Sequence, residues 1–134
     1  MEEIWRKIPN IDGYEVSSAG NVRSVAREVR VVNGRNGATK RIVASRLLKA
    51  CPTYINGHQH YVTVRLNGKT QYVHRLVASA FLGKAPFGPR SEVNHKDGNR
   101  HNNNLYNLEW CSKKMNEQHS QLLRAKRKAK TAHE

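Results

Sequence analysis

Apolar and polar residues alternate along residues 14–25, and a period of two is typical of half-buried β-strands. Tyr14 and Val16 share one parity, the turn-like sequence Ala19-Gly20-Asn21 follows, and the alternation then resumes. We therefore predict a short hairpin here. Residues 26–50 mix basic residues with two Asn-Gly pairs, which predicts two edge strands around a Gly/Asn loop.

The same alternation recurs in HYVTVRL, residues 60–66, and Asn67-Gly68 follows directly. An Asn-Gly pair suits the positive φ angles of a type I′ turn, so we predict a second hairpin with one buried and one wet face. From His74 onward the apolar residues fall at helical spacing instead. Gly83 stands where a glycine commonly ends a helix, so a short helix is expected to pack on the sheet.

The last part of the chain predicts two strands and a second helix. Residues 84–92 contain two prolines and a glycine and should form an exposed crossover. Residues 93–95 and 105–110 are short strand candidates joined by an irregular polar loop, and Ser112 can N-cap the helix. One side of that helix carries apolar residues, namely Met115, Leu122 and Leu123. The pattern predicts an α+β fold.

Charge is the strongest compositional signal. Lys and Arg number 24 against 10 Asp and Glu, which gives a net charge of +14 over 134 residues and a pI of about 10.3. Such a charge favours a polyanionic partner, most simply duplex nucleic acid, with a membrane surface as the rival. No apolar run approaches the roughly 18 residues of a membrane span, and MEEIWRKIPN lacks the pattern of a signal peptide. We expect an intracellular protein.

Two cysteines, Cys51 and Cys111, stand far apart in the sequence and outside any C-x-x-C spacing. This argues against a disulfide framework and against a four-ligand zinc site. We expect both to be small buried thiols.

Polar side chains of three predicted elements can meet in the C-terminal half. The order strand, loop, strand, helix brings the end of the first strand close to the first turns of the helix. Asn94 and His95 end that strand, and Asn116 and His119 lie three residues apart on one helical face. We expect these four side chains to converge.

The string V-N-H-K-D-G-N, followed by N-L-E-W and the helical Asn116, resembles the HNH endonucleases of the homing type that phages and mobile introns encode. The resemblance covers about residues 72–119 and includes VHRLVASAF. Separately, IWRKIPNIDGYEVSSAGNVRSV resembles the nuclease-associated modular DNA-binding motif found at the N-terminus of such enzymes. The expected division is a DNA-binding β module in 1–50 and an HNH unit of the ββα-metal type, with a basic C-terminal helix, in 51–134.

The resemblance implies a metal-dependent DNA endonuclease that hydrolyses phosphodiester bonds, nicking or cutting duplex DNA. His95 would be the general base, since an imidazole titrates near neutral pH. Asn94 and Asn116 would hold one divalent cation, most simply Mg²⁺ or Mn²⁺. His119 is the alternative helix ligand and would shift the preference toward Mn²⁺, Ni²⁺ or Zn²⁺. Asn107 would tie the loop to the second strand and hold His95 in orientation.

This chain departs from the family at both ligand positions, because many members carry Asp at the first and His at the second. Two neutral amides bind Mg²⁺ more weakly than a carboxylate does. We therefore expect poor metal retention without DNA, whose phosphates would supply most of the ligand charge.

Basic residues of the N-terminal half and of the final helix are the expected DNA contacts, most of them to phosphates. They are Arg23, Arg27, Arg30, Arg35, Lys40, Arg41, Arg46, Lys49, Lys113 and Lys114. The C-terminal run LLRAKRKAK is either a phosphate-contacting extension of the helix or a solvated tail.

Two further function classes stay open at this level. A DNA-binding module with a decayed nuclease site is suggested by Asn at both ligand positions, and an RNA-binding domain is disfavoured by the scarcity of aromatic residues for stacking bases. A monomer would nick and a homodimer would cut both strands. Larger relatives add a helix-turn-helix, so specificity is expected to be modest or supplied by another chain. If the chain is phage-encoded, its compartment is the host cytoplasm.

Overall fold

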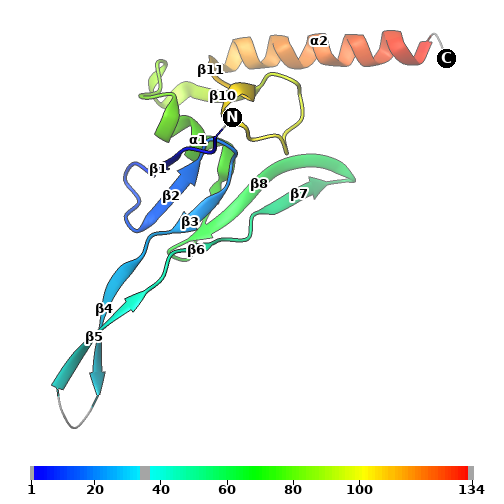
Figure 1. Ribbon diagram of the computed structural model, residues 1–134. Helices are drawn as coiled ribbons and strands as arrows, with labels where there is room; N and C mark the ends of the chain where they lie inside the picture. The colour runs from blue at the N-terminus through cyan, green and yellow to red at the C-terminus, as the bar shows by residue number, and fades with distance from the viewer. Residues whose placement is uncertain (1, 34–36, 133–134) are drawn as a thin grey trace.

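The computed structural model describes residues 2–33 and 37–132, and its first sheet is built from the N-terminal segment. Four antiparallel strands pair in the order β1-β2-β3-β6 (Figure 1). The predicted hairpin is confirmed, since Tyr14 pairs with Ser24 and Val16 with Val22. The strands are β1 (Trp5–Lys7), β2 (Tyr14–Ser17), β3 (Val22–Ser24) and β6 (Arg46–Leu47).

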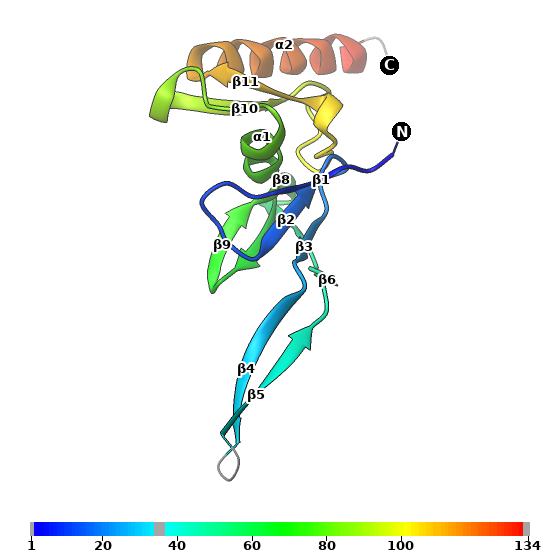
Figure 2. The same cartoon turned by 60° about the vertical axis from the view of Figure 1, so that its left-hand side comes forward.

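A two-stranded ribbon, β4 (Arg27–Asn33) with β5 (Gly37–Val43), leaves this sheet and extends away from the rest of the molecule (Figures 1 and 2). The two edge strands expected in residues 26–50 are thus confirmed, and they pair with each other. Arg35 lies outside the described residues.

The second sheet has three antiparallel strands, β7 (Cys51–Ile55), β8 (His58–Leu66) and β9 (Lys69–Tyr72). The predicted turn between β8 and β9 is confirmed, because Asn67 and Gly68 both have positive φ. β7 is an addition that the sequence pattern did not predict. It starts with Cys-Pro, shows little alternation, and pairs with β8 through an irregular register between Pro52 and Tyr54.

The helix α1 (Val73–Phe81) packs against both sheets and buries Val73, Leu76 and Val77. It ends as predicted. The N–H of Leu82 donates to the carbonyl of Ala78, and the next residue, Gly83, has a φ of +77°.

The last three elements form a ββα unit of antiparallel strands β10 (Ser91–His95) and β11 (Leu108–Ser112) with the long helix α2 (Lys113–Ala132). The first strand starts two residues earlier than predicted, because Ser91 and Glu92 already pair with β11. The second strand starts three residues later, because Leu105–Asn107 is a 3₁₀ turn. The predicted N-cap is confirmed, since Ser112 Oγ accepts the N–H of Met115 at 3.2 Å.

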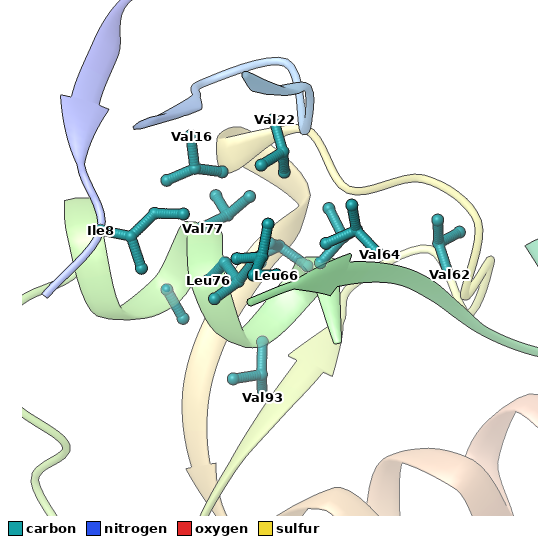
Figure 3. Packing of buried hydrophobic residues seen from close by; sticks show 12 residues of the cluster. Ile8, Val16, Val22, Val62, Val64, Leu66, Leu76, Val77 and Val93 are labelled. Atoms are coloured by element: carbon teal, nitrogen blue, oxygen red, sulfur yellow. The ribbon is translucent and has the colours of Figure 1, made fainter. Parts of the chain in front are cut away.

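One hydrophobic core joins the N-terminal sheet to the C-terminal unit (Figure 3). Val16 and Val22 of the first sheet pack in the same cluster as Leu66 of β8, Val77 of α1 and Val93 of β10. The two units expected from the sequence therefore share their interior, and the boundary at residue 50 stays a prediction.

Met115 and Leu122, on the apolar side of α2, are 52% and 62% exposed, and the helix runs past the sheet (Figures 1 and 2). One side-chain prediction was wrong, because Cys51 is exposed on the edge strand β7, whereas Cys111 is buried as expected. Burial raises the pKa of the Cys111 thiol to about 11, which leaves it protonated and unreactive.

Candidate active site

The four side chains expected to converge line a single cavity of about 620 Å³ between the ββα unit and the β7–β8 hairpin. Antiparallel register places Asn94 opposite Glu109 and His95 opposite Leu108, at the end of β10. The first turns of α2 then bring Asn116 and His119 to the same cavity. Asn94 and His95 are only 6% and 5% exposed, so the surrounding protein holds both side chains in place.

The ring of His95 is held by one strong hydrogen bond, 2.9 Å between its Nε2 and Oδ1 of Asn103. An amide oxygen only accepts, so the neutral ring carries its proton on Nε2 and keeps a lone pair on Nδ1. Burial lowers the pKa of His95 below its usual value, while the Asn103 hydrogen bond and the carboxylate of Asp97 act in the opposite direction. The imidazole is thus neutral at neutral pH.

Two aromatic rings, those of His74 and Tyr61, pack beside the His95 ring. The ring centroid of His74 lies 5.2 Å from that of His95, and Tyr61 lies 4.5 Å from His74 and 6.2 Å from His95. His74 lies in the first turn of α1.

The hydrogen-bond partner of His95 is Asn103 and not Asn107, so the orienting role expected for Asn107 is corrected. The other part of its expected role is seen, because Asn107 ties the loop: its carbonyl accepts the N–H of Lys96 at 2.8 Å, its Oδ1 accepts the N–H of Asp97 at 3.0 Å, and its Nδ2 donates to Asp97 Oδ1 and to the carbonyl of Asn102, both at 2.9 Å. Sequence reasoning treated residues 102–104 as equivalent loop asparagines. Nothing in the run of three distinguishes the one that turns inward.

The amides of Asn94 and Asn116 are each tied to a carboxylate. Nδ2 of Asn94 donates to Glu109 Oε1, and Nδ2 of Asn116 donates to Glu92 Oε2, both at 2.8 Å. In each side chain, the amide oxygen is then the end that can accept a hydrogen bond or bind a cation. Nε2 of His119 is buried and has no hydrogen-bond partner among the described residues.

This donor set fits a hard divalent cation. Asn94, Asn116 and His119 line the cavity and offer two amide oxygens and one unpartnered imidazole nitrogen, and such oxygen and nitrogen donors suit Mg²⁺ and Mn²⁺, with more nitrogen favouring Zn²⁺ or Ni²⁺. Over residues 2–33 and 37–132, no three His, Cys, Asp or Glu side chains group as a metal site. A cation in this cavity would therefore depend on the amides of Asn94 and Asn116.

Positive side chains also line the cavity, among them Arg100 from the loop and Arg124 from α2. The Arg100 guanidinium lies 5.3 Å from the ring centroid of Tyr61 and donates to the carbonyl of Gln59 at 3.1 Å. Arg100 was missed because a single Arg in an Asn/Gly-rich loop carries no periodic signal. Arg124 belongs to the basic run already noted.

The residues predicted to contact DNA fall into two groups, one engaged within the protein and one exposed. Arg23 is engaged within the first sheet, 2.9 Å from Glu15 and 4.0 Å above the ring of Trp5. The others that the structure describes are exposed, on the β4–β5 ribbon, in the segment after it, or at the start of α2: Arg27, Arg30, Lys40, Arg41, Arg46, Lys49, Lys113 and Lys114. Arg30 pairs directly with Lys40 across the ribbon. In the part of the chain that the structure describes, no helix combines the length and apolarity needed to cross a bilayer.

Comparison with known proteins agrees with this geometry. Residues 71–118 match the family described as HNH endonuclease, and residues 3–67 match the NUMOD4 motif. The chain is 60% identical over 107 residues to an uncharacterized HNH endonuclease, L247, of Acanthamoeba polyphaga mimivirus, which covers 80% of this chain and 22% of that protein. It is 34% identical over 113 residues to the DNA endonuclease I-HmuI of Bacillus phage SP01, which covers 84% of this chain and 54% of that protein.

A solved structure, described as DNA binding and cleavage by the HNH homing endonuclease I-HmuI, matches with a TM-score of 0.58 and 31% identity. The match covers 93% of this chain and 60% of the other chain. The chain thus spans about a fifth of the mimivirus protein and little more than half of I-HmuI.

Proposed function

Because the chain belongs to the HNH endonuclease family and also carries a NUMOD4 motif, we propose that it is a metal-dependent endonuclease that hydrolyses phosphodiester bonds of duplex DNA. The observation that carries the proposal is the convergence on one cavity of a buried histidine and two amides held by carboxylates.

His95 is the proposed general base. Its Nδ1 lone pair takes the proton from the attacking water, and the Asn103 hydrogen bond on Nε2 stabilises the charge that the ring then carries. The lowered pKa keeps the ring neutral, and so able to accept a proton, at neutral pH. The arrangement supports base catalysis by this one residue.

Asn94 and Asn116 are the proposed cation ligands, with His119 as the second choice on the helix. The unpartnered Nε2 of His119 supports its inclusion beside the two amides. A divalent cation bound there would stabilise the charge that develops on the phosphoryl group and on the departing 3′ oxygen. Mg²⁺ or Mn²⁺ is proposed first, and Ni²⁺ or Zn²⁺ if His119 is a ligand.

DNA is proposed to reach the cavity along basic surface. Arg100 and Arg124 attract the phosphates next to the scissile bond, and the β4–β5 ribbon and the start of α2 provide the more distant contacts. The NUMOD4 match over residues 3–67, which include the ribbon, supports this assignment. A monomer with this one candidate site would nick, whereas a homodimer would cut both strands, and the proposed place of action is inside a host cell.

Supercoiled plasmid tests this function directly. The full chain with Mg²⁺ or Mn²⁺ should convert plasmid to the nicked form, EDTA should stop it, and His95→Ala should lower the rate by about 10²- to 10⁴-fold. His101→Ala is the matched control, because that ring packs on Tyr54 and its Nε2 lies 3.3 Å from the carbonyl oxygen of Thr53, so it shares neither the hydrogen bond nor the ring packing of His95. Nicking that persists in His95→Ala would show that another residue is the base.

One observation favours a second function, a DNA-binding module without cleavage, because both candidate ligands on the strand and helix are neutral amides. The same assay separates the two. Absence of nicking with every metal, together with retained DNA binding, would establish the binding module instead.

A further inference from the structure

We propose that Glu109 and Glu92 are positioning residues that turn the amide oxygens of Asn94 and Asn116 toward the bound cation. This inference rests on the proposed function, since it concerns how the same cavity acquires a cation. It explains how a site with amides at both positions can work in this chain.

The geometry pairs each amide with its own carboxylate. Asn94 and Glu109 are direct cross-strand partners in β10 and β11, and Nδ2 of Asn94 lies 2.8 Å from Glu109 Oε1. Glu92 lies two residues before Asn94, hence on the same face of β10, and its Oε2 lies 2.8 Å from Nδ2 of Asn116 on α2. Glu92 and Glu109 thus bind both amides on one face of the β10–β11 sheet.

A carboxylate selects one of the two orientations of an amide. It accepts hydrogen bonds and donates none, so it binds the NH₂ end and repels the carbonyl end. The amide oxygen must then point away from the carboxylate. Because Asn94 and Asn116 both line the cavity, that oxygen is available to a cation there.

The carboxylates also add charge that the amides lack. Each places a negative charge one hydrogen bond behind a neutral ligand, which polarises the amide and increases the electron density on its oxygen. Carboxylates that support metal ligands in this way typically change metal affinity by about 10- to 100-fold.

Mn²⁺ affinity is the readout that tests the proposal apart from cleavage. The full chain carrying His95→Ala is bound to a short duplex, which the missing base leaves intact, and titrated with MnCl₂ while free Mn²⁺ is followed by electron paramagnetic resonance. Glu109→Ala and Glu92→Ala in this background should each weaken Mn²⁺ binding by about 10-fold. Glu117→Ala removes the same charge from an exposed position beside Asn116 on α2 and should change the affinity by less than about 2-fold.

Conservative variants separate orientation from direct ligation. Gln at 109 or 92 can still accept the amide hydrogen bond through its own oxygen but lacks the charge and can also donate, so Glu109→Gln and Glu92→Gln should retain part of the affinity that the Ala variants lose. A group that itself binds the cation would instead lose affinity in both variants. Equal losses in Gln and Ala would therefore overturn the proposal.

The double variant Asn94→Asp with Glu109→Ala gives the sharpest result. A carboxylate at position 94 presents an oxygen on either side and needs no orienting partner, so the double variant should bind Mn²⁺ at least as tightly as Asn94→Asp alone. Unchanged affinity in Glu109→Ala and Glu92→Ala would overturn the inference alone. Absence of Mn²⁺ binding in the parent complex would overturn the cation-dependent function and the inference together.

Discussion

At the scale of single residues, His95, the proposed base, packs on a histidine that is itself costly to ionise. His74 is 3% exposed beneath His95, and its Nδ1 has no hydrogen-bond partner among the described residues. Burial lowers the pKa of His74 to about 3, with the positive charge that His95 can carry as the next cause. His74 therefore stays neutral and places no positive charge beside His95.

His74 should make the folded state sensitive to mild acid. The folded pKa lies below the unfolded value of about 6.5, so the unfolded chain binds the proton first and stability is lost as pH falls below that value. Between pH 7 and pH 5 we expect the free energy of unfolding to drop by about 2 kcal/mol from this residue. Urea titrations at the two pH values measure it.

Substituting His74 shows whether it causes this drop in the free energy of unfolding. His74→Phe keeps a ring in the cluster and removes the titration, so most of the drop should disappear, with a remainder from His95, whose pKa is also lowered. His58→Phe alters an exposed histidine and should leave the drop unchanged. An undiminished drop in His74→Phe would assign the acid sensitivity to other groups.

At the scale of elements, the N-terminal sheet is in contact with the loop that hydrogen-bonds His95. The turn between β2 and β3 packs on Asn103, and the N–H of Leu105 donates to the carbonyl of Ser18 at 2.8 Å. Gly20 permits this approach, because a Cβ there would lie 2.9 Å from Cβ and 3.0 Å from the carbonyl oxygen of Asn103. The NUMOD4 segment thus helps to position Asn103 and, through it, His95.

Gly20→Ala should therefore affect both stability and cleavage. Gly13→Ala is the matched control, because Gly13 has nearly the same φ, +87° against +84°, and nothing lies within 4 Å of its added Cβ. Strain from the positive φ is common to both, so Gly20→Ala should cost about 1–2 kcal/mol more in the free energy of unfolding. It should also slow plasmid nicking at a temperature where both variants are folded. Equal nicking rates would show that the turn does not act on the loop that contacts His95.

At the scale of the whole molecule, basic surface is spread along an elongated shape. The β4–β5 ribbon and α2, which lines the cavity, lie at opposite ends of the protein (Figures 1 and 2). The net charge of +14 is therefore suited to a long DNA contact rather than to a single patch. Most of its affinity should come from phosphates.

Salt dependence measures this interaction. Arg30 and Lys40 pair on one face of the ribbon, and replacing both by Ala should reduce the slope of log K against log salt by about 1 to 2, near 0.9 for each phosphate that is no longer neutralised. Replacing Lys7 and Lys84 removes the same charge from exposed positions outside the proposed DNA surface and should change the slope much less. Binding isotherms with a labelled duplex at several salt concentrations provide the comparison. Equal slopes in the two double variants would exclude the ribbon from the DNA-binding surface.

Local patterns were sufficient for much of the fold and for the residue types of the site. Strand alternation, Asn67-Gly68, Gly83 and Ser112 each report a backbone conformation or a buried face that depends on close neighbours in sequence, so the hairpins, α1 and the start of α2 were predictable. The site candidates were predictable because the ββα order itself brings a strand end and a helix start together.

Contacts between distant residues were decided only by the tertiary structure. Which asparagine faces His95, which carboxylate binds each amide, the engagement of Arg23 by Trp5 and the pairing of β7 all depend on register and packing over many residues. A sequence pattern shows which face of an element is apolar. It does not distinguish between several polar residues of the same element, because all of them fit that pattern equally well. Their roles differ only once the sheets, helix and loop have packed around one cavity, because a hydrogen bond needs its two partners within about 3 Å.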